Sequence, residues 1–439
     1  MQFVSTRSAG ETASFATALT RGLASDGGLY VPSQWPSFAP AQFADDNTLA
    51  QLAARVIEPF AAGDVLAPQL GAIVAEAFNF PAPLEMVDVG KNLRVLELFH
   101  GPTAAFKDFG ARFLAAALAQ LRAGHRKTLR ILVATSGDTG GAVAAAFHRR
   151  PGIEVVVLFP KGLVSPTQER QLTCWGDNVH SFAVRGSFDD CQRMVKEAFR
   201  DPWFTADADL SSANSINVGR LLPQAVYYVA ASLAIQRATG QSASFIVPSG
   251  NLGNSVACAW ARRMGLPIDQ IYLAHDLNRM VPDYLATGRL EPRPGVTTLA
   301  SAMNVGDPSN LERMRALYPD LKQIRGAVCA TSITDGQIAA RIRADFERYG
   351  RVWCPHTAVA AQAFVDMPDA LRNDAGGRPR NWVMVSTAHP AKFREIVTPL
   401  IGREPEVPEN LARLFERPSQ FDEIEAALPS LRTALSPKR

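Results

Sequence analysis

The strongest constraint on the fold is a strand–turn–helix–turn–strand pattern between residues 129 and 159. Residues 129–134 (LRILVA) and 153–159 (IEVVVLF) are apolar runs of strand length, and the alanine-rich segment 141–150 (GAVAAAFHRR) lies between them. Short apolar runs bounded by turn residues are typical of strands buried on both faces. Two such strands joined by a helix form a right-handed βαβ unit with parallel strands. The sequence therefore predicts an α/β architecture built on parallel sheet.

The same alternation of strand and helix continues along the chain. Further strand–helix pairs are predicted at 178–184 with 188–200 and at 244–247 with 253–265, and further strands at 271–275 and 381–386. This alternation predicts at least two parallel-sheet lobes. Residues 1–95 differ, because their helix-like segments are separated by proline-rich breaks. We therefore expect a separate N-terminal domain over residues 1–95.

The charge balance and the cysteines restrict the class of protein and its compartment. Lys and Arg number 45 against 42 Asp and Glu, a net charge of +3, so no electrostatic feature predicts a nucleic-acid partner. The first residues lack an apolar core of signal-peptide length, and the apolar run 225–235 is too short to span a bilayer. The five cysteines form no CxxC pair and no metal-ligand spacing. These features predict free thiols, no metal site, no membrane partner and a cytoplasmic location.

Two glycine-rich turns, 134–141 (ATSGDTGG) and 248–254 (PSGNLGN), each follow a predicted strand and open a predicted helix. Ligands of parallel sheets bind at such turns, where glycine permits a close backbone approach and the first helical N–H groups point at an anion. Either turn alone is compatible with a simple capped helix start. Neither carries a P-loop or a complete dinucleotide fingerprint, so the pair favours a small phosphorylated ligand over ATP or NAD.

Polar groups also gather at two other predicted element ends. Residues 214–220 (NSINVGR) lie near a predicted helix start, and Arg220 can hold a phosphate through two parallel hydrogen bonds. A capped helix with a surface arginine is the alternative interpretation. Thr387 and His389 follow a predicted strand and could reach a ligand from the sheet edge, although such a histidine is by default a structural hydrogen-bonding group.

Lys107 lies in the segment 100–110 (HGPTAAFKDFG), between a phenylalanine and an aspartate. By itself it could be an ordinary solvated lysine. Combined with two anion sites, it predicts pyridoxal phosphate, since a lysine amine forms a Schiff base with that aldehyde and is a better nucleophile when its surroundings lower its pKa. The absence of GxSxG, HExxH and carboxylate clusters disfavours hydrolases and metal enzymes.

Five motifs in this order resemble the threonine synthase family of fold type II pyridoxal-phosphate enzymes: HGPTAAFKDFG, ATSGDTG, SSANSINVGR, VPSGNLGN and STAHPAKF. Residues 5–8 (STRS) and 22–32 (GLASDGGLYVP) resemble the extra N-terminal domain of the longer members. One motif is a weak signal, whereas five in order are highly specific. The resemblance covers nearly the whole chain. It implies a catalytic region over 96–439, with a small mobile lobe at about 111–212 and the remainder in a large lobe.

The resemblance also implies a role for each motif residue. Lys107 would be the Schiff-base lysine and proton shuttle, Asp138 would lie near the hydroxyl of the pyridine ring, and Thr387 would hydrogen-bond the ring nitrogen. A neutral hydroxyl there gives a milder electron sink than a carboxylate, which favours elimination and replacement over transamination. The other implied contacts are Gly250, Asn251, Leu252, Gly253 and Asn254 for the cofactor phosphate, Thr135, Ser136 and Thr139 for the substrate carboxylate, and Ser215, Asn217 and Arg220 for the substrate phosphate.

The implied activity is that of a carbon–oxygen lyase that converts O-phospho-L-homoserine and water to L-threonine and phosphate, the last step of threonine biosynthesis. Three alternatives stay open. One is a phospho-lyase of the same family that releases phosphate and a 2-oxo acid without making threonine. The others are a dehydratase or sulfhydrylase of the same fold, which needs no phosphate clamp, and a non-catalytic α/β binding protein. The expected partner is a small-molecule substrate, and the chain is expected to be a monomer or a homodimer.

Overall fold

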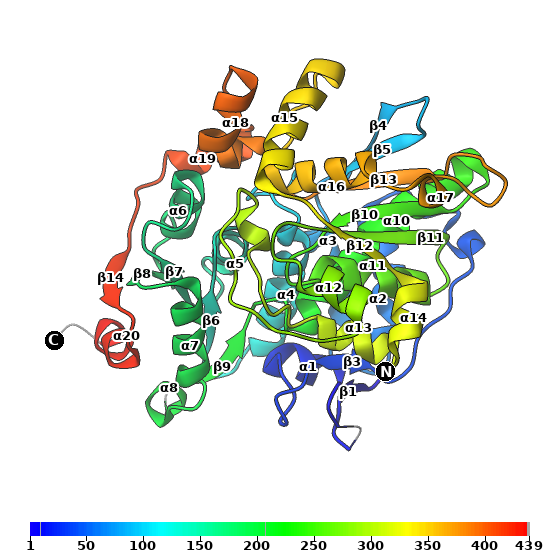
Figure 1. Cartoon of the computed structure of the whole chain (residues 1–439). Coiled ribbons are helices and arrows are strands. Elements are labelled where there is room, and N and C mark those ends of the chain that lie inside the picture. The colour runs from blue at the N-terminus through cyan, green and yellow to red at the C-terminus, as the bar shows by residue number, and fades with distance from the viewer. Residues whose placement is uncertain (9, 207, 437–439) are drawn as a thin grey trace.

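The computed structural model describes residues 1–8, 10–206 and 208–436, and its strands form three sheets (Figure 1). The largest sheet has six strands in the order β12 (Cys329–Ser332), β11 (Ile268–His275), β10 (Ala243–Pro248), β13 (Asn381–Ser386), β5 (Leu93–Glu97) and β4 (Leu84–Asp88). The second has five strands in the order β14 (Asp422–Glu425), β8 (Val179–Arg185), β7 (Ile153–Pro160), β6 (Thr128–Ala134) and β9 (Ala208–Ser212). The third consists of β2 (Thr12–Ala13), β1 (Phe3–Ser5) and β3 (Tyr30–Pro32).

Parallel pairing dominates the two larger sheets, as the sequence predicts. The five-stranded sheet is parallel throughout, and in the six-stranded sheet only the edge pair β4–β5 is antiparallel among the described strands. The small N-terminal sheet is antiparallel. The prediction of an α/β protein with two parallel-sheet lobes is therefore confirmed.

The helices cover these sheets and connect their strands. The α-helices are α1 (Phe15–Arg21), α2 (Leu49–Ala61), α3 (Leu70–Ala77), α4 (Lys107–Arg122), α5 (Asp138–Phe147), α6 (Pro166–Thr173), α7 (Phe188–Ala198), α8 (Pro202–Ala206), α9 (Val218–Leu221), α10 (Ala225–Thr239), α11 (Gly253–Arg263), α12 (Met280–Thr287), α13 (Leu311–Leu317), α14 (Leu321–Ala327), α15 (Asp335–Tyr349), α16 (Pro355–Val365), α17 (Asp369–Arg372), α18 (Arg394–Ile401), α19 (Glu409–Phe415) and α20 (Leu428–Leu435). Short 3₁₀ turns are η1 (Pro40–Phe43), η2 (Ala67–Gln69), η3 (Leu222–Gln224), η4 (Ser301–Met303) and η5 (Pro390–Phe393).

The strands of both large sheets bury side chains on both faces, which explains their unbroken apolar sequences. In β10, Phe245 and Val247 join the central core, whereas Ile246 between them joins a second core that includes α16. In β6, Ile131 joins the central core and Leu132 joins a third core that includes α7. Because successive side chains of a strand point to opposite faces, each lobe is a sheet between two helical layers.

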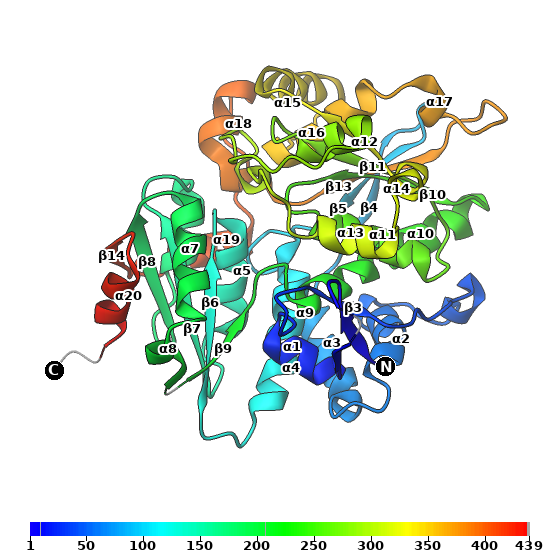
Figure 2. The same ribbon diagram turned by 60° about the horizontal axis from the view of Figure 1, so that its bottom comes forward.

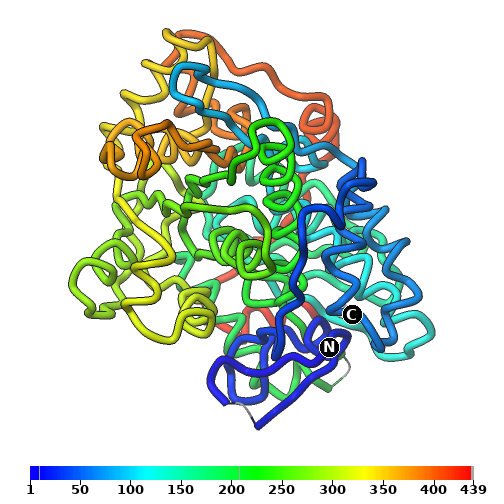
Figure 3. The backbone as a smooth tube through the Cα atoms, turned by 90° about the vertical axis from the view of Figure 1, so that its right-hand side faces the viewer, coloured from blue at the N-terminus to red at the C-terminus, as the bar shows by residue number. Residues whose placement is uncertain are grey.

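The two lobes lie side by side, and the N-terminal elements lie beneath the junction between them (Figure 2). Figure 3 shows the N-terminal segment in blue at the bottom of the molecule and rising along its right-hand side. Within the described part of the chain, the helical stretch Val218–Thr239 is long and apolar enough to cross a membrane by length and composition, but 89% of its apolar 18-residue window is buried inside the protein. It is therefore a core helix, and it packs on α2 and α11.

Two segments pair outside the regions to which the predicted domain limits assign them. Strands β4 and β5 begin before residue 95 but pair within the six-stranded sheet. The C-terminal chain passes from α18 in the large lobe to β14 and α20 beside the small lobe (Figure 1), where β14 pairs with β8. The short charged sequence of β14, DEIE, carries little strand signal, because an exposed edge strand buries few side chains.

Candidate active site

A cavity between the two lobes is lined by nearly all the residues that the sequence singled out. It lies where strands end and helices begin in both sheets, as expected for ligand sites of parallel sheets. The predicted residues on its wall are Lys107, Thr135, Ser136, Asp138, Thr139, Ser215, Arg220, Gly250, Asn251, Leu252, Gly253, Asn254 and Thr387. Segments that are far apart in the sequence therefore meet around one space.

Lys107 stands at the first position of α4, and the loop before it is fastened to the end of β13. The Phe106 amide donates to the Thr387 carbonyl at 2.8 Å. This contact brings Lys107 and Thr387 to the same cavity. Burial lowers the pKa of Lys107 to about 8; the Asp138 carboxylate opposes that shift, and the Arg220 and Lys392 cations add to it. An amine with this pKa is partly the free base near neutral pH, the form that attacks an aldehyde.

The turn at the start of α5 is shaped by Thr135 and Gly137. The Thr135 hydroxyl accepts hydrogen bonds from the Gly137 and Gly140 amides, both at 2.9 Å. Gly137 has a φ of 135°, a conformation that side-chain-bearing residues rarely adopt, and a Cβ there would lie 2.4 Å from the Gln168 side chain. The Thr135 hydroxyl is thus engaged by its own turn, while Ser136 and Thr139, which also carry hydroxyls, line the cavity.

Asp138 is a buried carboxylate held by partners from both lobes. Its Oδ1 lies 2.7 Å from the Lys392 ammonium and 3.1 Å from the Gln168 Nε2 donor. Burial alone would raise the pKa of Asp138, but the charges of Lys392 and Lys107 outweigh it and hold the pKa well below its usual range. Asp138 therefore faces the cavity as an anion.

The second glycine turn opens α11 and presents donors to the cavity. Leu252 adopts a left-handed conformation with a φ of 60°, which turns the chain sharply into the helix. A Cβ at Gly250 would lie 2.8 Å from the Met303 Cα, so only glycine fits this wall. The Asn254 Oδ1 accepts from Tyr227 at 2.5 Å and from Tyr228 at 2.8 Å, which leaves Asn254 Nδ2 as a buried donor without a partner among the described residues.

Arg220 and Ser215 form a second polar group on the cavity wall. Arg220 is 2% exposed, its Nη1 donates to the Ala213 carbonyl, and its Nε has no hydrogen-bond partner among the residues that the structure describes. Burial lowers the pKa of Arg220 to about 10, so it remains cationic near neutral pH. The Ser215 hydroxyl oxygen accepts from Asn251 at 2.8 Å and from Asn310 at 3.2 Å, which leaves its proton free for another acceptor.

Asn217 is the predicted substrate residue that does not line the cavity. Its Nδ2 donates to the Leu19 and Ser212 carbonyls, and its Oδ1 accepts from the Gly219 amide at 2.9 Å. The side chain is fully buried and caps α9. The structure therefore assigns Asn217 a structural role in place of the predicted phosphate contact.

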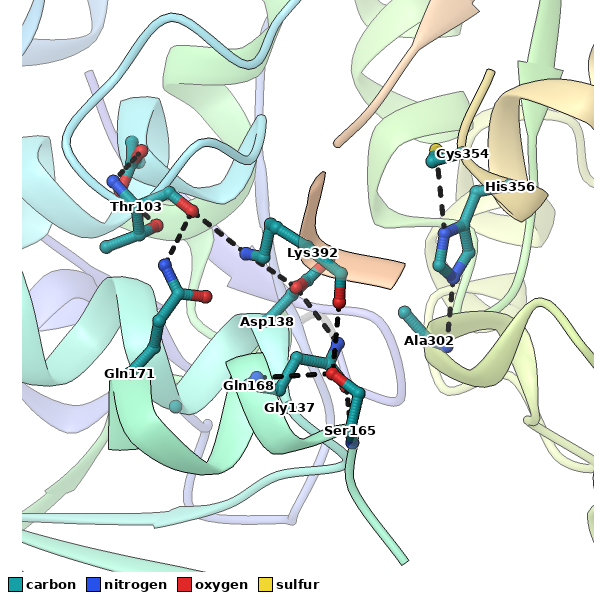
Figure 4. Close-up of polar contacts among 12 residues, drawn as sticks. Thr103, Gly137, Asp138, Ser165, Gln168, Gln171, Ala302, Cys354, His356 and Lys392 are labelled. Atoms are coloured by element: carbon teal, nitrogen blue, oxygen red, sulfur yellow. Dashed lines mark hydrogen bonds and ion pairs between the residues drawn. The ribbon is translucent and has the colours of Figure 1, made fainter. Parts of the chain in front are cut away.

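The sequence did not single out His356 and Lys392, which also belong to this site. His356 lines the cavity, and its Nε2 accepts from the Ala302 amide at 3.0 Å. Burial lowers the pKa of His356 to about 4, so the imidazole is neutral. Figure 4 shows His356 between Ala302 and Cys354, and Lys392 directed at Asp138 and Thr103. Of the two, only Lys392 falls within a recognised motif, STAHPAKF. His389 instead caps η5, with Nδ1 accepting from the Ala391 amide.

The residues present fit pyridoxal phosphate. A donor-lined cradle suited to a phosphate is formed by Asn254 Nδ2, which has no partner in the described part of the chain, by the first-turn amides of α11 and by the close wall at Gly250. Lys107 supplies a partly free amine for the aldehyde. Thr387, at the end of β13, supplies a neutral hydroxyl for a ring nitrogen. Arg220 and Ser215 remain as a separate group for a second anion.

Comparison with family models divides the chain into three matching regions. Residues 82–388 match the model described as pyridoxal-phosphate dependent enzyme. Residues 2–78 match threonine synthase N terminus, and residues 357–434 match threonine synthase, C-terminal. The matched regions together span nearly the whole chain.

Known proteins resemble the chain over its full length. A threonine synthase of Haemophilus influenzae is 38% identical, with 97% of each chain covered. The crystal structure of threonine synthase from Escherichia coli superposes with a TM-score of 0.89 at 35% identity, covering 99% of each chain. A structure of pyridoxal-phosphate-bound threonine synthase from Brucella melitensis superposes with a TM-score of 0.88 at 36% identity, covering 99% of this chain and 98% of that one.

Proposed function

The chain belongs to the threonine synthase family of pyridoxal-phosphate-dependent enzymes, and from this premise we propose that it converts O-phospho-L-homoserine and water to L-threonine and phosphate. Its cofactor is pyridoxal 5′-phosphate. The observation that carries the proposal is a single cavity in which Lys107 lies together with two separate anion-binding groups. One group suits the cofactor phosphate and the other suits the phosphate of a substrate.

The bound cofactor supplies a conjugated ring that disperses negative charge from the substrate α-carbon. Lys107 is the group that moves protons at the substrate carbons, because its amine faces the cavity and its lowered pKa leaves part of it as free base. The hydroxyls of Ser136 and Thr139 at the start of α5 are placed to bind a carboxylate. Thr387 would hold the ring nitrogen with a neutral hydroxyl, as proposed from the motif.

Arg220 and Ser215 would bind the leaving phosphate. In the described part of the chain, the buried Arg220 cation has no partner for its Nε, and the Ser215 hydroxyl accepts from Asn251, which leaves its proton for an acceptor. Charge-assisted hydrogen bonds strengthen as negative charge grows on the departing group, so these donors would stabilise the departure of phosphate. A dehydratase or sulfhydrylase, whose substrate carries no phosphate, would not require this second group.

Product analysis tests the proposal. Purified enzyme with bound cofactor is incubated with O-phospho-L-homoserine, and products are measured by mass spectrometry together with phosphate release. We expect threonine and phosphate in equal amounts. Phosphate with 2-oxobutyrate and no threonine would instead identify a phospho-lyase, and no turnover would refute both.

The proposed partner is this small-molecule substrate. A cytoplasmic location is proposed because the five cysteines are free thiols. A monomer or a homodimer is proposed for the oligomeric state. Light scattering of the purified enzyme tests the oligomeric state.

A further inference from the structure

Lys392 is a fully buried lysine beside the reactive lysine, and the proposed mechanism does not use it. Its side chain is 0% exposed, and its ammonium lies 2.7 Å from Asp138 Oδ1 and 2.9 Å from the Thr103 carbonyl. The carboxylate partner is 3% exposed. A buried ion pair costs desolvation that often cancels its attraction, so stability alone is a weak reason for its presence.

The contacts of Lys392 join the two lobes around Asp138 (Figure 4). Lys392 belongs to η5, after the last strand of the large sheet, whereas Asp138 begins α5 in the small lobe. The Lys392 carbonyl accepts from the Ser165 hydroxyl at 3.1 Å, and Ser165 caps α6 of the small lobe. Gln171 of the same helix donates to the Thr103 carbonyl that Lys392 also binds.

The charged groups around Lys107 show which carboxylate could pair with its amine. Asp138 faces Lys107 from α5, Arg220 from α9 and Lys392 from η5. The neutral His356 faces Asp138 from α16. Asp108, the remaining buried acid here, is occupied by the Thr103 amide and hydroxyl. Asp138 is therefore the carboxylate available to Lys107. The cation closest to Asp138 is Lys392.

We propose that Lys392 is a positioning residue that binds the Asp138 carboxylate and so keeps it from pairing with the Lys107 amine. At 2.7 Å the Lys392–Asp138 pair acts on Lys107 almost as a neutral dipole. Lys107 then stays available as a free base, while Asp138 stays ionised and fixed at the cavity wall. The role rests on the proposed function of Lys107, but the contacts themselves do not.

The test measures the pH midpoint for acylation of Lys107 by acetic anhydride in cofactor-free protein, followed by mass spectrometry. Lys392→Met removes the cation that neutralises Asp138, so the midpoint should rise by about one pH unit or more. Adding Asp138→Asn removes the uncompensated charge, and the midpoint of the double variant should return to within about half a unit of the wild type. Lys161→Met, an exposed lysine paired with Glu423, is the control and should leave the midpoint unchanged.

Two results would overturn the proposal: an unchanged midpoint in Lys392→Met, or a rise in the double variant as large as in the single one. A purely structural role would lower the melting temperature without this pattern. Should Lys392→Met not fold, the double variant decides alone, because it removes both charges of the Lys392–Asp138 pair: a midpoint near the wild type supports the proposal, and a rise of about one unit refutes it. Failure of the enzyme to make threonine would refute the proposed function and leave these midpoints measurable.

Discussion

Asn251 donates from its Nδ2 to the Ser215 hydroxyl at 2.8 Å, and this bond joins the two anion-binding groups of the cavity. Asn251 belongs to the turn proposed to hold the cofactor phosphate, and Ser215 belongs to the segment proposed to hold the substrate phosphate. The bond orients the serine so that its own proton is free to donate. It also makes the two binding events energetically dependent on each other.

Ser215→Ala should therefore affect both ligands, but unequally. It removes a donor to the substrate phosphate and leaves the Asn251 donor without an acceptor. We expect KM for phosphohomoserine to rise about 10-fold or more, because a charge-assisted hydrogen bond to the substrate phosphate is lost. Cofactor affinity should fall by about 2–10-fold, because only a neutral hydrogen bond is lost there. Steady-state kinetics and cofactor titration measure the two effects. Ser232→Ala, a buried serine of α10 away from the cavity wall, is the control. An unchanged KM would refute the substrate role.

Lys107→Ala should abolish the covalent attachment of the cofactor and lower turnover by at least about 10³-fold, because the variant loses both the nucleophile and the proton shuttle. Borohydride reduction followed by peptide mass spectrometry should find the cofactor on Lys107 in the wild type. Lys322→Ala, which alters an exposed lysine of α14, should retain attachment and rate. Near-normal turnover by Lys107→Ala would remove Lys107 from the mechanism.

The lowered pKa of Lys107 should appear in the stability of the cofactor-free protein. The folded-state pKa of about 8 lies below the ordinary value of 10.5, so between these values the unfolded chain binds more protons, and the Lys107 contribution to stability rises with pH. Below pH 8 the folded protein carries Lys107 as a buried cation, and the cost of burying that charge lowers the free energy of unfolding. Lys107→Met should thus raise the free energy of unfolding by about 1–3 kcal/mol at neutral pH, and the gain should vanish as the pH approaches 10.5.

Urea unfolding of both cofactor-free proteins at several pH values measures this difference. A gain that is equal at neutral and alkaline pH would show that the effect comes from packing and not from the buried charge.

The fold and most of this cavity could be predicted because their signals are local. Strands buried on both faces leave apolar runs, and the helix starts at Asp138 and Gly253 leave glycine and polar residues within a few positions. The edge strand β14 left no such signal, since charged residues occupy all of its exposed positions. The same reason explains why the sequence did not predict that the chain end returns to the small lobe.

The side chains that orient the site could not be predicted, because their partners are distant in the chain. Lys392 and the Thr103 carbonyl are 289 positions apart. Asn217 shows the opposite error: its place in a motif suggested a ligand contact, yet its amide is used by the Leu19 and Ser212 carbonyls and by the cap of α9. A motif identifies which residues lie near a site, but only the tertiary hydrogen bonds show which of them still have donors to offer.

Arg220 should separate substrate binding from cofactor binding. Arg220→Ala removes the buried guanidinium whose Nε has no partner among the described residues, so KM for phosphohomoserine should rise about 10–100-fold while the absorbance of the bound cofactor survives. Arg220→Lys keeps the charge but cannot form two parallel hydrogen bonds to a phosphate, so KM should rise less than in Arg220→Ala. Loss of cofactor absorbance in both variants would show instead that Arg220 serves the cofactor.

Arg313 should affect stability and substrate binding together. Its side chain is fully buried and donates to the carbonyls of Tyr30, Ser215 and Ile216, which ties the N-terminal sheet to the substrate segment. Arg313→Met leaves these carbonyls unsatisfied, so the free energy of unfolding should fall by about 2–4 kcal/mol and KM should rise as Ser215 loosens. Arg315→Met, an exposed neighbour on α13, is the matched control for urea unfolding and kinetics. A destabilised Arg313→Met enzyme with wild-type KM would show that the N-terminal sheet does not position Ser215.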